Sequence, residues 1–314
     1  MLKVGLIGLG GISSSHVSAW KEVEGAELVA GCDIRPEQFA AYPELRHYTD
    51  FHDMLEHEEL DILDVCLPTY LHAKFAVEAM NRGIHVICEK PISLEVSDVD
   101  LLYSTAEKNG VKFMVAQVIR FWPEYLLLKE IYDTKRYGEL LSGEMERMGG
   151  YPKWSWENWM MDETRSGSVP FDLHIHDLDF MIYTFGKPSS VNHFRSKRPG
   201  QDYIQVVYTF PTFSIDIKAA WYASDYPFHM DFRFQFENAV VAYENGTLSI
   251  YQRDGRVVCP FQESGNSEFS EIPQSSGYAN EIRYFAECVR DDRPQTIVKQ
   301  EEMETDLRIL KGIH

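Results

Sequence analysis

The 314-residue sequence predicts an α/β chain with two domains: a doubly wound parallel sheet, then an α/β domain with a large, mainly antiparallel open sheet. Over residues 1–118, short apolar runs alternate with amphipathic stretches, as parallel strands buried on both faces and their connecting helices do. From about residue 138, several runs alternate in polarity, and Gly or Asn turns separate them. That pattern is typical of strands with one covered face. We therefore expect domains over residues 1–118 and 119–314.

The elements follow from these patterns in chain order. In the first domain the predicted strands are KVGLIG, AELVAGCD, ILDVCLP, IHVICEK and VKFMVAQ. Between and after them, helices are expected at residues 12–23, 36–41, 51–57, 72–82 and 94–109, connected by right-handed crossovers. In the second domain, seven β-rich stretches run from ELLSGEMERM to TLSIYQR, with helices at 124–133, 173–185 and 279–290. The last segment, EMETDLRILKGIH, also reads as a helix, so we expect the natural protein to extend slightly further.

Composition and charge exclude several classes of protein. The formal net charge is −19 and no basic run offsets it, so the chain is not expected to bind nucleic acid. No apolar run approaches the roughly 18 residues of a membrane span. The opening MLKVGLIGLGGI lacks the cleavage site of a signal peptide and reads as a buried strand entering a glycine turn. Five widely spaced cysteines without a CxxC pair indicate a reduced, cytoplasmic protein.

A dinucleotide-binding turn is predicted at GLIGLGGISSSH, which follows the first strand and opens a helix. Gly8 and Gly10 occupy the first two positions of a G-x-G-x-x-G pattern, and Ser13 takes the third. Such a turn brings the backbone close to a pyrophosphate at the helix N-terminus, where free N–H groups favour negative charge. The next strand ends at Asp33, placed to bind a ribose diol. Its carboxylate would repel a 2′-phosphate, which favours NAD over NADP, although Arg35 nearby could soften the repulsion.

A second candidate site lies at VICEKPIS, residues 86–93. Ligands of doubly wound sheets bind beyond the carboxyl ends of the strands, so Lys90 should point at the cofactor crevice. Pro91 could fix its backbone through a cis bond. The alternative is a surface lysine before a proline that starts a helix.

The stretch FDLHIHDLDF (171–180) could form either of two chemically active sites. On a strand, His174 and His176 would share a face and could bind a metal. On a helix, Asp172 and His176 would share a face, so that the carboxylate orients the imidazole and leaves its other nitrogen to take a proton. The apolar spacing after residue 172 favours the helix and this proton relay. The remaining alternative is that both histidines only satisfy hydrogen-bonding groups at helix ends.

Taken together, these motifs resemble the glucose–fructose oxidoreductase / inositol dehydrogenase (Gfo/Idh/MocA) family. The matching pieces occur in the family's order and span nearly the whole chain: GLGGISSSH, CLPTYLHAKFAVEAMNRGIHVICEKPIS, IRFWPEYLLLKE and SGSVPFDLHIHDLDFMIYTFG. The resemblance implies a Rossmann domain followed by an α/β domain with a large open sheet. Two departures stand out: Pro68-Thr69 replaces the common Thr-Pro, and His174 stands where many members have glycine.

The resemblance also implies an activity. Members mostly oxidise or reduce a carbinol carbon of a sugar, cyclitol or related polyol with NAD(P), and commonly pair through the open sheet face. We therefore expect an NAD(P)-dependent oxidoreductase that forms a homodimer or homotetramer. One alternative is a glycosidase that keeps NAD bound and uses transient oxidation, as some members do. Another is a non-catalytic dinucleotide sensor, which the joint presence of Lys90, Asp172 and His176 disfavours.

Specific residues are assigned to each role. The expected catalytic residues are Lys90, Asp172 and His176. The same three residues are expected to bind substrate, with Arg120 from the family pattern and Trp159 from the aromatic stretch YPKWSWENWMMD, whose tryptophans suit either sugar stacking or packing. Cofactor binding is assigned to Gly8, Gly10, Gly11, Ile12, Asp33, Arg35, Pro68, Thr69, His72, Glu89 and Lys90. No metal is expected.

Overall fold

A computed structural model describes residues 1–262 and 271–314. The chain forms two compact units. The first comprises Met1–Val118 and Ser276–Leu307, and the second comprises Ile119–Ser275 and Arg308–His314.

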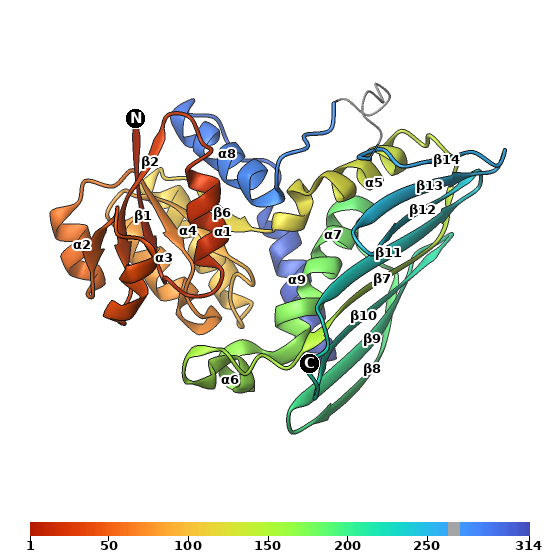
Figure 1. Ribbon diagram of the computed structural model, residues 1–314, viewed down its shortest axis with the longest axis horizontal. Helices are drawn as coiled ribbons and strands as arrows, with labels where there is room; N and C mark the ends of the chain where they lie inside the picture. The colour runs from red at the N-terminus through yellow and green to blue at the C-terminus, as the bar shows by residue number, and fades with distance from the viewer. Residues whose placement is uncertain (263–270) are drawn as a thin grey trace. The chain divides into compact units, whose positions relative to one another are not determined.

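The first unit is built on a six-stranded sheet whose strands all pair in parallel (Figure 1). In spatial order the strands are β3 (Arg46–Tyr48), β2 (Ala26–Cys32), β1 (Leu2–Ile7), β4 (Ile62–Val65), β5 (His85–Glu89) and β6 (Phe113–Ala116). This order is that of a dinucleotide-binding doubly wound fold, and it reverses direction between β1 and β4. The predicted parallel sheet is therefore confirmed.

The five predicted strands are all present because their apolar residues are buried; every residue of β4 and β6, for example, is buried. The sequence patterns missed β3. Its three residues form a short edge strand of polar, largely exposed side chains, and no apolar run marks it.

The helices of this unit are α1 (Ser13–Trp20), α2 (Phe51–His57), α3 (His72–Asn81), α4 (Ser97–Asn109), α8 (Gly277–Arg290) and most of α9 (Gln300–Ile313). The pair α1 and α8 pack together, as do α3 and α4. The helix expected at 36–41 is a 3₁₀ turn, Pro36–Ala41.

The structure places Ser276–Leu307 in the first unit, whereas the sequence division assigned everything after residue 118 to the second domain. The physical reason is the apolar face of α8. Ala279, Ile282 and Phe285 are fully buried on it, and the helix packs against α1. The chain thus returns to the first unit near its end, which strand and helix patterns alone do not reveal.

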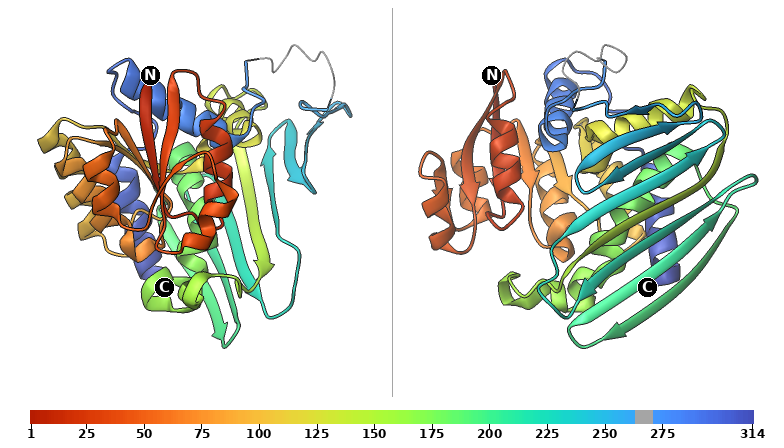
Figure 2. Two further views of the ribbon diagram at one scale, coloured as in Figure 1. Left: turned by 60° about the vertical axis from the view of Figure 1, so that its left-hand side comes forward. Right: turned by 45° about the vertical axis from the view of Figure 1, so that its right-hand side comes forward.

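The second unit contains an eight-stranded mixed sheet, seen face-on in the right panel of Figure 2. Its spatial order is β14 (Val257–Val258), β13 (Thr247–Gln252), β12 (Ala239–Glu244), β11 (His229–Phe236), β7 (Leu140–Gly150), β10 (Ser214–Tyr222), β9 (Gln201–Thr209) and β8 (Ser190–Arg198). Only β7 and β10 pair in parallel among these described strands. The expectation of a mainly antiparallel sheet is confirmed.

Helices α5 (Pro123–Asp133) and α7 (Ile175–Phe185) cover one face of this sheet (Figure 1). Tyr125 of α5 lies with its ring 4.9 Å from that of Phe180 and 5.0 Å from that of Phe232 on β11. The other short elements are the 3₁₀ segments Val118–Phe121 and Trp156–Met161, α6 (Glu163–Ser166) and a π-helical turn Pro170–His174. No helix in the described parts of the chain is long and apolar enough to cross a membrane.

The helix predicted at 173–185 is thus a π turn that continues into α7. His174 ends the π turn and lies fully buried, with Nε2 2.7 Å from the Tyr208 hydroxyl on β9. Its Nδ1 has no hydrogen-bond partner among the described residues. Burial lowers the pKa of His174 to about 3, so the ring is neutral at physiological pH.

Because the pKa of His174 is lower in the folded state than its unfolded value of about 6.5, the unfolded chain binds the extra proton first. His174 should therefore weaken the fold as the pH falls below 6.5, by about 2 kcal/mol at pH 5. His174→Gln keeps a donor near Nε2 but does not titrate. Urea unfolding at pH 7 and pH 5 should show a smaller acid loss in H174Q than in the unaltered protein; equal losses would contradict a buried neutral histidine.

Candidate cofactor and catalytic sites

The glycine turn follows β1 at the carboxyl edge of the first sheet. Gly8 has φ +93°, and a Cβ there would lie 2.6 Å from the Cys66 carbonyl oxygen, so only glycine fits. A Cβ at Gly10 would meet nothing within 4 Å, and Gly10 is partly exposed. Ser13 is buried and donates its hydroxyl to the Gly10 carbonyl at 2.7 Å. The open space above Gly10 and the start of α1 fit a pyrophosphate against backbone N–H groups.

Asp33 follows β2 at the same edge and connects the glycine turn to the loop after β2. Its Oδ2 accepts from the Leu9 N–H at 2.9 Å, and its Oδ1 accepts from the Arg35 N–H at 2.9 Å. The Arg35 guanidinium donates to both oxygens at 3.0 Å. A carboxylate has about four lone-pair sites, and these four contacts use them. Ribose hydroxyls can bind Asp33 only if the Arg35 side chain, which is 23% exposed, swings away.

The loop after β4 also opens at this edge. Pro68 precedes a 3₁₀ turn, Thr69–Leu71, and is partly exposed, whereas Thr69 is buried. His72 is 1% exposed, with Nδ1 2.8 Å from the Pro91 carbonyl and Nε2 2.7 Å from the Leu67 carbonyl. Both ring nitrogens face the protein's own backbone, so they are not placed to hydrogen-bond a cofactor in this structure.

Lys90 follows β5, is partly exposed, and precedes a cis peptide bond to Pro91, as expected. Glu89, the last residue of β5, is 6% exposed. Its Oε2 accepts from the Lys90 N–H at 3.1 Å, and its Oε1 lies 2.8 Å from His16 Nε2. Glu89 was assigned to the cofactor, but its carboxylate points inward and holds the backbone of Lys90.

Sequence reasoning missed the buried cluster behind Glu89. His16 on α1 lies between two carboxylates, with Nδ1 2.8 Å from Asp64 Oδ2 and Nε2 on Glu89. Trp20 donates its indole N–H to Asp64 at 2.7 Å. The signal in the sequence was Asp64, a charged residue inside the apolar run ILDVC. Although desolvation opposes it, the Asp64 charge raises the pKa of His16 well above its ordinary value.

The second unit carries the FDLHIHDLDF stretch, where two aspartates serve the fold. Asp177 is buried and accepts from Arg147 Nη2 at 2.9 Å. Asp179 is also buried and accepts from Arg120 Nε at 2.8 Å and Nη2 at 2.6 Å. Arg120 was assigned to substrate, but this side chain is 0% exposed and forms a two-pronged ion pair with Asp179. This ion pair connects Arg120 to α7.

Within this ten-residue stretch only Asp172 and His176 are partly exposed; the other eight residues are buried. The accessible histidine is therefore the one that the relay hypothesis selects. His174 and His176 are helical rather than on a strand, and neither belongs to a metal-type cluster found among the described residues. Those clusters are His16 with Asp64 and Cys66, and Glu146 with His229 and Asp231.

The aromatic stretch before α6 lies at the surface of the second unit. Trp159 is partly exposed and Trp154 is 72% exposed. Glu157 and Asn158, between them, adopt left-handed backbone conformations with φ of 47° and 53°. The segment is thus a turn with two left-handed residues between two tryptophans that reach the surface.

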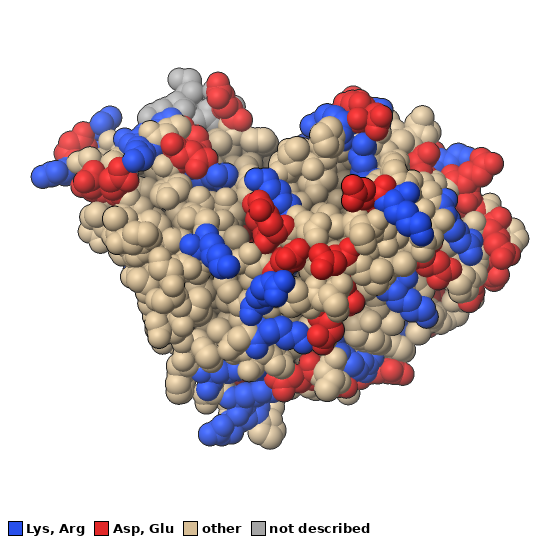
Figure 3. All heavy atoms as spheres, turned by 180° about the vertical axis from the view of Figure 1, so that it is seen from behind, with Lys and Arg blue, Asp and Glu red and all other residues tan. Residues whose placement is uncertain are grey.

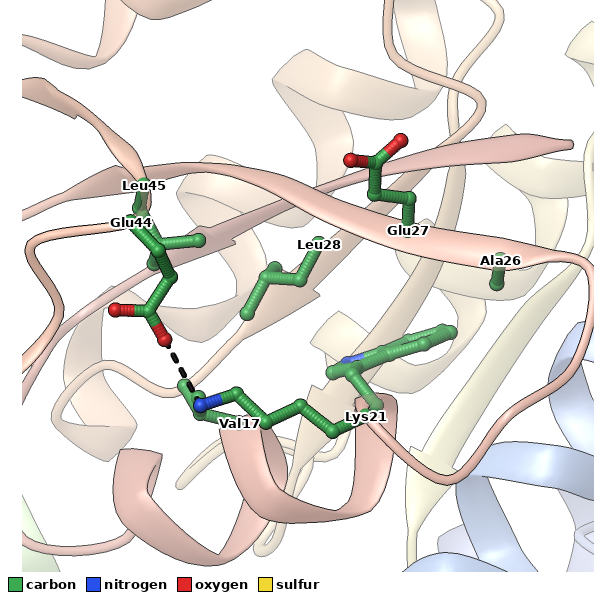
Figure 4. Close-up of a pocket in the computed structure, with 8 residues that line it drawn as sticks. Val17, Lys21, Ala26, Glu27, Leu28, Glu44 and Leu45 are labelled. Carbon is green, nitrogen blue, oxygen red and sulfur yellow. Dashed lines mark ion pairs between the residues drawn. The ribbon is translucent and has the colours of Figure 1, made fainter.

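One hollow on the first unit lies away from these motifs. It is lined by Val17, Trp20, Lys21, Ala26, Glu27, Leu28, Glu44 and Leu45, and a Lys21–Glu44 ion pair of 2.8 Å lies at its rim (Figure 4). None of the assigned site residues lines it. On the face in Figure 3, Lys and Arg are interspersed with Asp and Glu, and no large basic area is visible.

Two relatives illustrate the range of similar proteins. D-apiose dehydrogenase of Paraburkholderia graminis is 27% identical over 230 residues, which cover 71% of this chain and 61% of that protein. The 2,7-anhydro-N-acetylneuraminate hydratase of Mediterraneibacter gnavus is 29% identical over 58% of this chain and 48% of that protein. The chain thus matches about half to three-fifths of the length of these relatives.

A solved structure extends the likeness in fold to the whole chain. Levoglucosan dehydrogenase, in complex with NADH and levoglucosan, superposes with a TM-score of 0.83 at 17% identity, covering 99% of this chain and 96% of that one. Two family models match the sequence directly. Residues 2–117 match the oxidoreductase family with an NAD-binding Rossmann fold, and residues 125–249 match the GFO/IDH/MocA C-terminal domain. The chain belongs to the GFO/IDH/MocA family of oxidoreductases.

Proposed function

We propose that this chain is an NAD(H)-dependent oxidoreductase that acts on a carbinol carbon of a sugar, cyclitol or related polyol. The observation that carries the proposal is the edge of the first sheet. There, the Gly8–Ser13 turn, the Asp33 carboxylate and Lys90 follow three parallel strands. The family match and a relative named as a sugar dehydrogenase support the same class of reaction.

In this proposal each residue has a distinct task. Bound NAD supplies the hydride acceptor. Lys90 presents a cationic group to the substrate oxygen, and His176 takes the hydroxyl proton as the carbon is oxidised. Asp172 orients the His176 ring and fixes which nitrogen accepts that proton. Trp159 packs against the sugar C–H face.

A net-neutral reaction is a second candidate, because one relative is named as a hydratase of an anhydro sugar rather than as a dehydrogenase. The NAD-retaining glycosidase is the related case, in which oxidation is transient. Such a reaction would use the same residues for proton transfer but release no reduced cofactor.

We further infer a cytoplasmic protein that assembles as a homodimer or homotetramer. The open face of the eight-stranded sheet, which no described helix covers in Figure 2, supports pairing. All five cysteines are free thiols in the structure. Light scattering coupled to gel filtration measures the assembly state.

The test of function is a screen of sugars, cyclitols and polyols with NAD and with NADP, followed by the absorbance of reduced nicotinamide. A dehydrogenase gives sustained NADH release with at least one substrate. Conversion of an anhydro sugar or glycoside without net NADH would favour the second candidate. Absence of either conversion, with dinucleotide still bound, would support the sensor alternative.

Asp33 should make NADH bind more tightly than NADPH, because its carboxylate, once the Arg35 side chain has swung away, accepts from the ribose hydroxyls and repels a 2′-phosphate. Replacing Asp33 with Ser or Ala should narrow that difference. Fluorescence titration with both reduced cofactors measures it, and equal affinities in the unaltered protein would contradict the assignment.

Lys90→Met should lower kcat by about 10²-fold or more and leave the Kd for NADH nearly unchanged. The side chain is proposed to act on the reacting oxygen, whereas the glycine turn and Asp33 hold the cofactor. If the cofactor affinity falls as far as kcat does, Lys90 is a cofactor-binding residue instead.

The two histidines of the second unit should differ sharply. His176→Asn should lower kcat by about 10²- to 10⁴-fold, the usual contribution of a general base. His174→Asn should cost much less in kcat, because His174 is buried against Tyr208 and acts through packing. Comparable losses in both variants, reproduced by a chelator, would restore the metal hypothesis.

A further inference from the structure

Two buried histidines contact the Glu89–Lys90–Pro91 turn from different helices. His16 on α1 reaches Glu89 through Nε2, and His72 at the start of α3 reaches the Pro91 carbonyl through Nδ1. Both side chains are at most 1% exposed. Neither belongs to the residues proposed to perform chemistry, so their placement on both sides of Lys90 calls for a separate explanation.

The hydrogen bonds of His16 need a proton on each ring nitrogen. Each nitrogen lies 2.8 Å from a carboxylate oxygen, and an ionised carboxylate only accepts. A neutral ring could satisfy one carboxylate and would turn a lone pair toward the other. Asp64 also accepts from the Trp20 indole, so its charge is held in place. The doubly protonated ring therefore links Asp64 to Glu89.

From Glu89 the chain of contacts leads directly to the reactive residue. The second oxygen of the same carboxylate accepts the Lys90 backbone N–H at 3.1 Å. Removing the His16 contact would leave the Glu89 carboxylate, which is 6% exposed, with one fewer donor. The carboxylate would then be free to rotate away from the Lys90 amide.

His72 completes the arrangement on the other side of Lys90. Its ring spans from the Leu67 carbonyl, after β4, to the Pro91 carbonyl, after β5. Burial lowers the pKa of His72, and a carbonyl oxygen only accepts, so the neutral ring hydrogen-bonds one of these carbonyls and only contacts the other. The ring lies between two neighbouring loops at the carboxyl edge of the sheet.

We propose that His16 and His72 are positioning residues that hold the Glu89–Lys90–Pro91 turn from both sides and so fix the backbone from which Lys90 acts. The proposal rests on the proposed function of Lys90. It assigns no chemistry to either histidine. A shift of about 1 Å in a catalytic group can cost roughly 10²-fold in rate, so the effect of loosening this turn should be measurable.

The two rings face the turn through different nitrogens, so substitution by Asn and by Gln should have opposite effects at the two positions. The amide nitrogen of Asn takes about the place of Nδ1, and that of Gln takes about the place of Nε2. H16Q therefore keeps a donor toward Glu89, and H16N loses it. For His72 the order is reversed, because H72N places an amide donor toward Pro91 and H72Q places it toward Leu67 instead.

A matched control is Trp20→Phe. It removes a buried hydrogen bond to Asp64 from the same cluster and leaves the contacts of both histidines with the turn. Four quantities are measured for all five variants: the melting temperature, kcat, the Kd for NADH, and deuterium exchange at the Lys90 amide.

We expect H16N and H72Q to lower kcat by roughly 10- to 10²-fold with the Kd for NADH nearly unchanged. H16Q and H72N should retain most of the turnover, and W20F should lose stability without losing kcat. The Lys90 amide should exchange faster in H16N than in W20F. If H16N does not fold, the H72N and H72Q pair gives the same decision.

The proposal is overturned if kcat falls in proportion to the melting temperature in all five variants, W20F included, and the exchange of the Lys90 amide does not change. Failure of the proposed function is a separate outcome. In that case Lys90→Met keeps full turnover, or the chain shows no turnover. The exchange measurement then still decides whether the histidines hold the turn.

Discussion

Six parallel strands end at one edge of the first sheet, and the segments at the ends of four of them carry most of the residues assigned to the cofactor. The Gly8–Ser13 turn follows β1, Asp33 follows β2, Pro68 follows β4, and Lys90 follows β5. Parallel pairing imposes this gathering, because each crossover returns the chain to the same starting edge. The strand order reverses between β1 and β4, the place where open α/β sheets bind ligands. The location of the site therefore follows from strand pairing and not from any single motif.

Buried ion pairs then determine how side chains are presented within each unit. Removing one partner of a buried pair costs about 3–5 kcal/mol, because the charge left behind is neither solvated nor paired. His16 is held between Asp64 and Glu89 in the first unit, and Asp177 and Asp179 are held by arginines in the second. These pairs favour rotations of α1 and α7 that keep these particular charges paired.

The parts of the structure that the sequence predicted are those with local patterns. Apolar runs gave the buried strands, and glycine spacing gave the turn at Gly8 and Gly10. Partners distant in sequence were not predictable. His72 and Arg120 are residue types that often bind ligands, yet they turn inward to contact Pro91 and Asp179. These partners lie 19 and 59 positions away in the sequence, too far for a local pattern to indicate them. Periodicity likewise could not show that α8 packs on α1, because an apolar helix face does not specify which core it joins.

The four-residue helical spacing singled out Asp172 and His176, which are the accessible residues of their stretch. The π turn at Pro170–His174 shows that this spacing is only part of the reason. Its i→i+5 bonding offsets the residues before it from those of α7, so Asp172 and His176 do not belong to one uninterrupted α-helix. What leaves His176 accessible is the set of inward contacts around it. His174 faces Tyr208, and Asp177 and Asp179 face arginines. Arg120 therefore bears on the proposed chemistry through its pair with Asp179, since losing that pair would release the rotation of the helix that presents His176.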